Sequence, residues 1–162
     1  MKRIFGLFII FGLLVQGVYA QEDYANSLWS HDLKGNVWMV MHADITGNGV
    51  PEIVVASGCC ANPGYVTVFD VSGSIVWQAR IPNEIRVMDI GDITGDGKLD
   101  VVVAATDRKV YFVSNNGEII NSYTDSSMVY VIKILDLNGD GKTEVVTASN
   151  NIRLFKNMKE LA

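Results

Sequence analysis

Three short acidic loops carry the side chains of this sequence that are best suited to chemistry. They read D-I-T-G-N-G-V-P-E at 44–52, D-I-T-G-D-G-K-L-D at 92–100 and D-L-N-G-D-G-K-T-E at 136–144. Counted from the first aspartate, positions 1, 3, 5 and 9 of each loop hold a side-chain oxygen, and positions 4 and 6 hold glycine. Because glycine accepts positive φ angles, each loop can turn tightly and bring its oxygens toward one point.

These oxygens predict one Ca²⁺ site in each loop, since calcium takes six to eight hard oxygen ligands. Position 7 changes chemistry freely, which is expected where only a backbone carbonyl coordinates. The loops contain no Cys or His, so metals that prefer thiolate or imidazole are disfavoured. The predicted ligands are the side chains of Asp44, Thr46, Asn48 and Glu52, of Asp92, Thr94, Asp96 and Asp100, and of Asp136, Asn138, Asp140 and Glu144, with the carbonyls of Val50, Lys98 and Lys142.

The alternative to a metal site is an ordinary Asn/Asp/Gly hairpin turn. Three copies that each end in an acid at position 9 favour calcium over that alternative. An EF-hand is excluded, because it needs a Glu at position 12, where these loops have Val55, Val103 and Thr147. The first loop brings only two carboxylates, because Asn48 is neutral, and we expect it to bind most weakly.

The acidic loops mark an internal repeat, with first aspartates 48 and 44 residues apart. Each loop leads into an apolar, β-branched run, then a second run, a Gly turn and a further run, which predicts strands. Four antiparallel strands at this repeat length are typical of a β-propeller blade. The predicted fold is therefore all-β, a partial β-propeller of about three four-stranded blades. The runs that follow the loops are 53–57, 101–105 and 145–149, and the second runs are 66–69, 110–113 and 152–155.

The first twenty residues have the layout of a secretory signal peptide. A positive M-K-R start precedes the apolar run 4–15, and Ala20 offers a cleavage site. An uncleaved anchor is the alternative, although the run is short for a membrane span. The sequence thus predicts a secreted, extracellular or cell-surface protein, with the periplasm also compatible. The net charge of −5 disfavours nucleic acid as a partner.

The repeat and the leader together predict the organisation of the chain. Because the third unit is incomplete, three arrangements remain open: a fragment of a longer propeller, self-association that completes a propeller, or an arc that stands alone. The predicted segments are a signal peptide at 1–20, a lead-in with the outer strand of a preceding blade at 21–35, blade 1 at 36–80, blade 2 at 81–125 and incomplete blade 3 at 126–162.

The loops and the apolar runs that follow them resemble FG-GAP/VCBS repeats, the units of integrin-α-like β-propellers. The resemblance implies that the loop joins the first two strands of a blade and binds Ca²⁺ through the ligands given above. It also implies a binding or adhesion module for an extracellular protein or carbohydrate ligand. No nucleophile–base arrangement is evident, so the chain is predicted not to be an enzyme. The alternative is the propeller scaffold of a secreted enzyme, either a polysaccharide lyase or a PQQ-type dehydrogenase, whose repeats residues 68–77 resemble.

Two further features lie outside the loops. Cys59 and Cys60 are adjacent, and three states remain open for them: free small side chains, pairing with another chain, or a vicinal disulfide that shapes a ligand site. Trp29, Trp38 and Trp77 are expected to pack between blades, although an exposed aromatic ring can also stack on a sugar.

Overall fold

The computed structural model describes residues 27–33, 35–60 and 63–156. The predicted signal peptide lies outside these residues. The chain divides into a first unit, Met1–Ser30, and a second unit, His31–Ala162. In the first unit, the described residues 27–30 form no regular element, and the hydroxyl of Ser27 donates a hydrogen bond to the Trp29 carbonyl (2.9 Å). All strands belong to the second unit.

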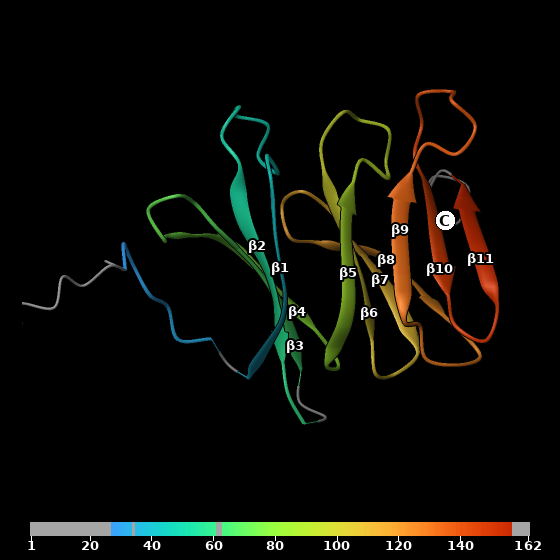
Figure 1. Cartoon of the computed structure of the whole chain (residues 1–162), viewed down its shortest axis with the longest axis horizontal. Coiled ribbons are helices and arrows are strands. Elements are labelled where there is room, and N and C mark those ends of the chain that lie inside the picture. Colours follow the sequence, from blue (N-terminus) through green and yellow to red (C-terminus); the bar gives the residue numbers. More distant parts are fainter. Residues whose placement is uncertain (1–26, 34, 61–62, 157–162) are drawn as a thin grey trace, which may run out of the picture. The chain divides into compact units, whose positions relative to one another are not determined.

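The second unit contains three antiparallel sheets, each made of strands consecutive in sequence (Figure 1). Consecutive strands pair because short turns return the chain beside itself. No helix occurs among the described residues, so the prediction of an all-β, propeller-type fold is confirmed. The first sheet holds β1 (Asn36–Ala43), β2 (Glu52–Gly58), β3 (Gly64–Phe69) and β4 (Ile75–Ile81); the second holds β5 (Ile85–Gly91), β6 (Asp100–Ala105), β7 (Lys109–Val113) and β8 (Ile119–Thr124); the third holds β9 (Val131–Leu135), β10 (Glu144–Ala148) and β11 (Ile152–Lys156).

The strand that follows each acidic loop lies inside its sheet and is apolar on both faces. All six residues of β6 are buried, as are six of the seven in β2. A strand covered on both sides loses the alternation of polar and apolar residues, which explains the continuous runs in the sequence. The outer strands β4 and β8 keep many exposed positions, consistent with one solvated side.

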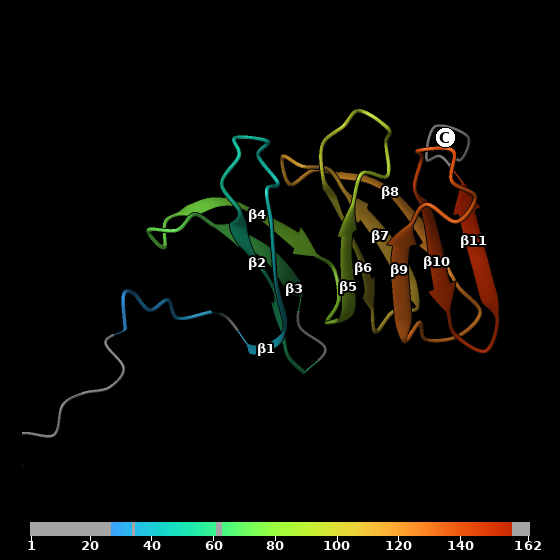
Figure 2. The ribbon, with the colours of Figure 1, turned by 45° about the horizontal axis from the view of Figure 1, so that its top comes forward.

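Figure 2 shows the three sheets following one another in sequence order. Two apolar cores hold neighbouring sheets together. The first core joins residues of the first and second sheets, and the second core joins the second and third sheets. Gly91 is required at the second contact, because a Cβ there would lie 2.4 Å from Ile134 Cγ2. The first strands of the second and third sheets, β5 and β9, are linked by a side chain and not by a backbone ladder. The Ile134 amide donates a hydrogen bond to Asp89 Oδ2 (2.9 Å).

Two parts of the structure differ from the sequence expectation. Residues 27–33 form no strand, although the sequence pattern at 28–35 matches the outer strand of a blade. A strand needs a hydrogen-bonded neighbour, and no described strand pairs with this segment. The third sheet has three strands within the described residues, and the last part of the predicted blade 3, residues 157–162, lies outside them.

The model gives no candidate for a membrane-crossing helix among the residues that it describes.

Candidate functional site

The first aspartate of each acidic loop organises the turn around its own carboxylate. Asp92 Oδ1 accepts hydrogen bonds from the amides of Gly95 (2.6 Å) and Asp96 (3.2 Å), and its Oδ2 accepts one from Gly97 (2.8 Å). Asp136 accepts the equivalent three bonds in the third loop, and Asp44 accepts two in the first. This pattern requires the loop glycines to have positive φ, as predicted: Gly47, Gly49, Gly95, Gly97, Gly139 and Gly141 have φ values of 72–85°.

The acid at position 9 is buried at the root of each loop. Glu52, Asp100 and Glu144 are only 2–3% exposed, because they are the first residues of β2, β6 and β10. Each accepts a hydrogen bond from the amide at position 2, such as that of Leu137 to Glu144 (2.9 Å). Burial raises the pKa of Asp100 above its ordinary value, although the Asn115 and Ile93 amides act in the opposite direction.

The side chains at positions 3 and 5 lie nearer to solvent. Position 5 caps the loop, because the Lys98 amide donates to Asp96 Oδ1 (2.9 Å) and the Lys142 amide to Asp140 Oδ1 (2.9 Å). At position 3, Thr94 donates its hydroxyl proton to the buried Asp100 (3.3 Å). In the first loop, Asn48 Oδ1 likewise accepts a hydrogen bond from the Val50 amide, and the Thr46 hydroxyl donates to Glu52.

The donor set of the acidic loops suits calcium, since every ligand position offers a hard oxygen. Among the described residues, no group of three or more His, Cys, Asp or Glu side chains converges closely enough to hold a metal ion. In this arrangement, the carboxylates of Asp92 and Asp136 are instead used by backbone amides. Calcium binding by the loops therefore stays a prediction.

A solvent-filled cleft of about 560 Å³ separates the second and third acidic loops. Asp92, Thr94, Asp140 and Lys142 contribute to its walls. The hydroxyl of Thr143, which also lines the cleft, donates to the Asp92 carbonyl and so connects the two loops directly. The ordering of one loop is therefore coupled to that of its neighbour.

Calcium is expected to stabilise the folded chain through these loops. At free calcium 100 times the dissociation constant, each occupied loop contributes about 2.7 kcal/mol to the free energy of unfolding. Asp96→Asn places a neutral side chain at position 5 of the second loop, as Asn48 does in the first. The substitution is expected to weaken calcium binding at the second loop alone, measured by calorimetric titration. Asp70→Asn, outside the acidic loops, is the matched control and should leave the titration unchanged. Absence of binding heat and an unchanged melting curve under chelation would contradict the site.

At the opposite end of the sheets, the residues around Trp38 form a second polar cluster. The Trp38 indole N–H donates to the Gly58 carbonyl (3.1 Å), which fixes the ring beside the β2–β3 turn. The Arg86 guanidinium lies over this ring, 4.5 Å from its centroid, and pairs with the buried Glu84 (3.6 Å). Cys59 and Cys60, which follow Gly58 in the chain, form a vicinal disulfide. This is the third of the states that the sequence left open.

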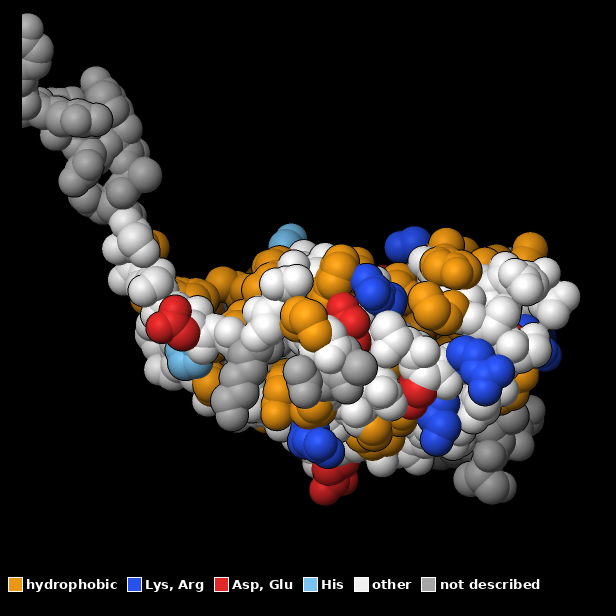
Figure 3. Space-filling view, turned by 90° about the horizontal axis from the view of Figure 1, so that it is seen from below, with side chains coloured by type: hydrophobic (Ala, Val, Ile, Leu, Met, Phe, Trp, Pro, Cys, Tyr) orange, Lys and Arg blue, Asp and Glu red, His pale blue; other side chains and the backbone are white. Residues whose placement is uncertain are grey.

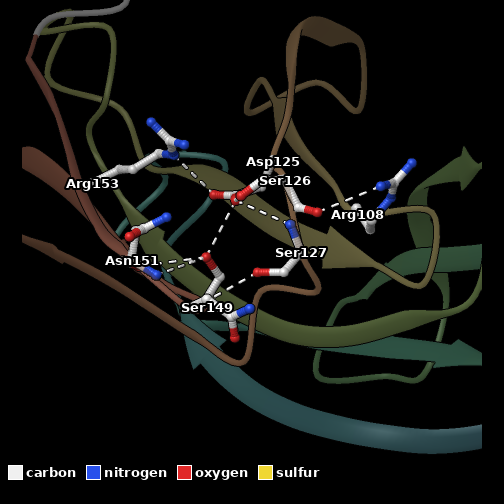
Figure 4. Close-up of polar contacts among 8 residues, drawn as sticks. Arg108, Asp125, Ser126, Ser127, Ser149, Asn151 and Arg153 are labelled. Carbon is white, nitrogen blue, oxygen red and sulfur yellow. Dashed lines mark hydrogen bonds and ion pairs between the residues drawn. The ribbon is translucent and has the colours of Figure 1, made fainter.

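The end of β8 carries another buried carboxylate, Asp125, in a network that reaches the third sheet (Figure 4). Its Oδ2 accepts from Arg153 Nε (3.0 Å), and its Oδ1 accepts from the Ser127 amide and the Ser149 hydroxyl. Burial raises the pKa of Asp125, but the hydrogen bonds from Ser127 and Arg153 outweigh it and hold the pKa below its ordinary value. The network connects the turn after the second sheet to the start of β11.

Sequence reasoning missed both clusters at the opposite end. Their members come from separate repeats, such as Trp38 in β1 and Arg86 in β5, and no short motif marks them. The expectation that Trp77 packs between blades agrees with its position, because its ring touches Gly117 in the turn before β8. Trp38, in contrast, is 40% exposed.

Comparison with known proteins identifies relatives of this chain in sequence and in structure. The sequence pattern of the lambda-carrageenase beta-propeller domain matches residues 16–133. The chain belongs to the lambda-carrageenase beta-propeller family. The match covers the first two sheets completely and reaches into β9.

Two similar proteins are themselves named lambda-carrageenase. The lambda-carrageenase of Pseudoalteromonas carrageenovora is 28% identical over 109 residues, and that of Pseudoalteromonas sp is 27% identical over 114 residues. These alignments cover 65% and 68% of this chain, but the chain spans only 11% of the length of either relative.

Solved structures show the same fold at lower identity. Crystal structures of BBS1N in complex with ARL6DN, soaked with mercury or with lead, each superpose with a TM-score of 0.58 and 14% identity. The superposition covers 76% of this chain and 34% of the other. At this identity the likeness supports the fold alone.

Membership in the lambda-carrageenase family corrects one prediction and narrows another. The prediction that the chain is not an enzyme is wrong, because the family is defined on a carrageenase and the relatives are named as that enzyme. The absence of a nucleophile–base motif could not decide the matter, since catalytic groups of a propeller enzyme are brought together from separate loops. Of the predicted FG-GAP/VCBS propeller, the β-propeller part is shown, and its family is the lambda-carrageenase type.

Proposed function

We propose that this chain is the propeller of a secreted, polysaccharide-degrading enzyme that acts on lambda-carrageenan. The observation that carries the proposal is the family match over residues 16–133, supported by 27–28% identity to two lambda-carrageenases. It agrees with the alternative raised by the sequence, the propeller of a secreted enzyme that degrades polysaccharide, better than with an adhesion module. The leader-like residues 1–20 support secretion.

The acidic loops have a structural part in this proposal. Calcium bound by each loop, in the manner of FG-GAP/VCBS repeats, holds the first two strands of a sheet in register and couples ion binding to folding. The calcium ligands lie at the loop end, whereas Trp38, Arg86 and Arg153 lie at the opposite end. The opposite end of the strands is thereby left free of calcium ligands.

Exposed apolar side chains support the presence of further blades beside the first and third sheets. Leu154 and Ile152 in β11 are 50% and 79% exposed, whereas their repeat equivalents in β7, Phe112 and Val110, are almost completely buried against the third sheet. On the first sheet, Val40 is 61% exposed, although its equivalent Met88 is buried. Additional blades, from a longer chain or from a second copy, would cover these faces as the second sheet covers its neighbours.

The proposed function is tested with purified chain and lambda-carrageenan. Retardation of the chain in a native gel that contains the polysaccharide, together with release of reducing ends, is the expected result. Agarose without charged groups is the control matrix. If the folded, calcium-loaded chain migrates normally and releases no reducing ends, the carrageenan assignment is wrong.

A further inference from the structure

Charge is divided between the two ends of the sheets. The loop end carries most of the acidic side chains of the described residues, against only three lysines, Lys98, Lys142 and Lys156. Repulsion at this end disfavours a polyanionic ligand. The acids at the loop end are Asp44, Glu52, Asp70, Asp92, Asp96, Asp100, Glu118, Asp136, Asp140 and Glu144.

The opposite end is cationic at its surface. Figure 3 looks onto this end and shows Lys and Arg side chains spread along the described surface among apolar side chains, with fewer Asp and Glu side chains between them. Two of its acids, Glu84 and Asp125, are at most 6% exposed, and the half-buried Asp107 accepts a hydrogen bond from the Tyr111 hydroxyl (2.6 Å). The cations at this end are Arg80, Arg86, Arg108, Lys109 and Arg153.

In the first two sheets, this end presents an aromatic ring beside a guanidinium. The Gly58 carbonyl holds the Trp38 indole, and Arg86 is held in turn by Trp38 and the buried Glu84. Both Trp38 and Arg86 remain more than a third exposed. A guanidinium that is already positioned loses less side-chain freedom when it binds an oxyanion.

A second guanidinium lies on the next turn along the same end. Arg108, in the β6–β7 turn, is exposed, and its Nη1 donates to the Ser126 carbonyl (3.4 Å) beside the Asp125 network (Figure 4). Trp38, Arg86 and Arg108 thus come from β1, β5 and the β6–β7 turn, at the same ends of successive sheets. An extended polymer laid across the sheets would meet them in turn.

We infer that the opposite end is a binding surface for a sulfated polysaccharide, on which Arg86 and Arg108 bind sulfate groups and Trp38 contacts a sugar ring. The inference rests on the proposed function and adds the place and the chemistry of binding. Guanidinium groups recognise oxyanions through paired N–H donors, and aromatic rings cover the apolar face of a sugar. The acids gathered at the loop end disfavour a polyanion there and leave the opposite end as the surface that can accept one.

Affinity electrophoresis of the full chain in gels with graded lambda-carrageenan tests the inference. Arg86→Gln and Arg108→Asn are each expected to raise the apparent dissociation constant about tenfold, the loss of one charge-assisted contact. Asn is chosen at position 108 because this residue has φ 67°, a conformation that Asn tolerates. Lys156→Asn removes one exposed charge at the loop end and is the matched control, expected to bind as the parent chain does.

The outcomes separate this inference from the proposed function. If the parent chain does not bind lambda-carrageenan, the proposed function fails. If it binds and both arginine variants bind equally well, the surface assignment is overturned while the function stands. Equal affinity for chemically desulfated galactan would overturn the role of sulfate. Thermal melting verifies folding, and Arg108→Asn, on an exposed turn, supplies the decisive result if Arg86→Gln unfolds.

Discussion

Replacing Phe112 with alanine is expected to lower the free energy of unfolding by about 3–5 kcal/mol, the usual cost of removing a buried aromatic ring. Phe112 is 1% exposed and belongs to the core between the second and third sheets. Its ring meets that of Phe155 edge-on, with centroids 5.9 Å apart. The substitution leaves a cavity at the contact that holds the third sheet in place.

Urea denaturation monitored by tryptophan fluorescence measures this loss. Ile120→Ala is the control, because Ile120 is 43% exposed on the outer strand β8 and its truncation should cost less than about 1 kcal/mol. If Phe112→Ala unfolds within 1 kcal/mol of the parent chain, the third sheet does not depend on this core.

Removing the Asp125 carboxylate has the second largest expected effect. Asp125→Ala leaves Arg153 and the Ser127 amide without their acceptor, and breaking a buried ion pair costs about 3–5 kcal/mol. We expect a value near 3 kcal/mol, because Arg153 is about one-third exposed and solvent screens it. Glu118→Ala, which removes an exposed acid, should change stability by less than about 0.5 kcal/mol.

The effect of Asp125 depends on pH in a direction that its lowered pKa fixes. A carboxyl group with a lower pKa in the folded than in the unfolded state stabilises the fold above its ordinary pKa of 3.8. That stabilisation is lost as the pH falls through the lower, folded value. Urea denaturation at pH 6 and at pH 3 should therefore show a smaller difference between parent and Asp125→Asn at pH 3. A difference that grows toward acid would contradict the network.

The sequence predicts the sheets well because the repeat makes each signal visible three times. Apolar runs after the acidic loops became the central strands β2, β6 and β10, where burial on both faces selects β-branched residues. The glycines of the loops took the positive φ angles that their spacing predicted. These features depend on neighbours close in sequence, so local patterns are enough to find them.

The links between sheets and the relation to an enzyme could not be predicted in this way. Asp89, Asp125 and Arg86 contact residues 28 to 48 positions away in another sheet, and their surroundings in sequence look like ordinary strand ends. Their partners are set by how one sheet packs on the next. The enzymatic relationship, likewise, became evident only through similarity along residues 16–133.

The pairing of strands within sheets has a consequence for how the gene can change. Among the described residues, every backbone ladder joins strands that are consecutive in the chain, and no ladder joins one sheet to the next; the Ile134 amide, for example, bonds to the Asp89 side chain instead. Each ladder therefore joins stretches that lie within one repeat of the chain, so one unit can fold after another. Duplication or loss of a whole unit would alter the number of sheets while each remaining one kept its own ladder intact, a route by which such proteins lengthen or shorten during evolution.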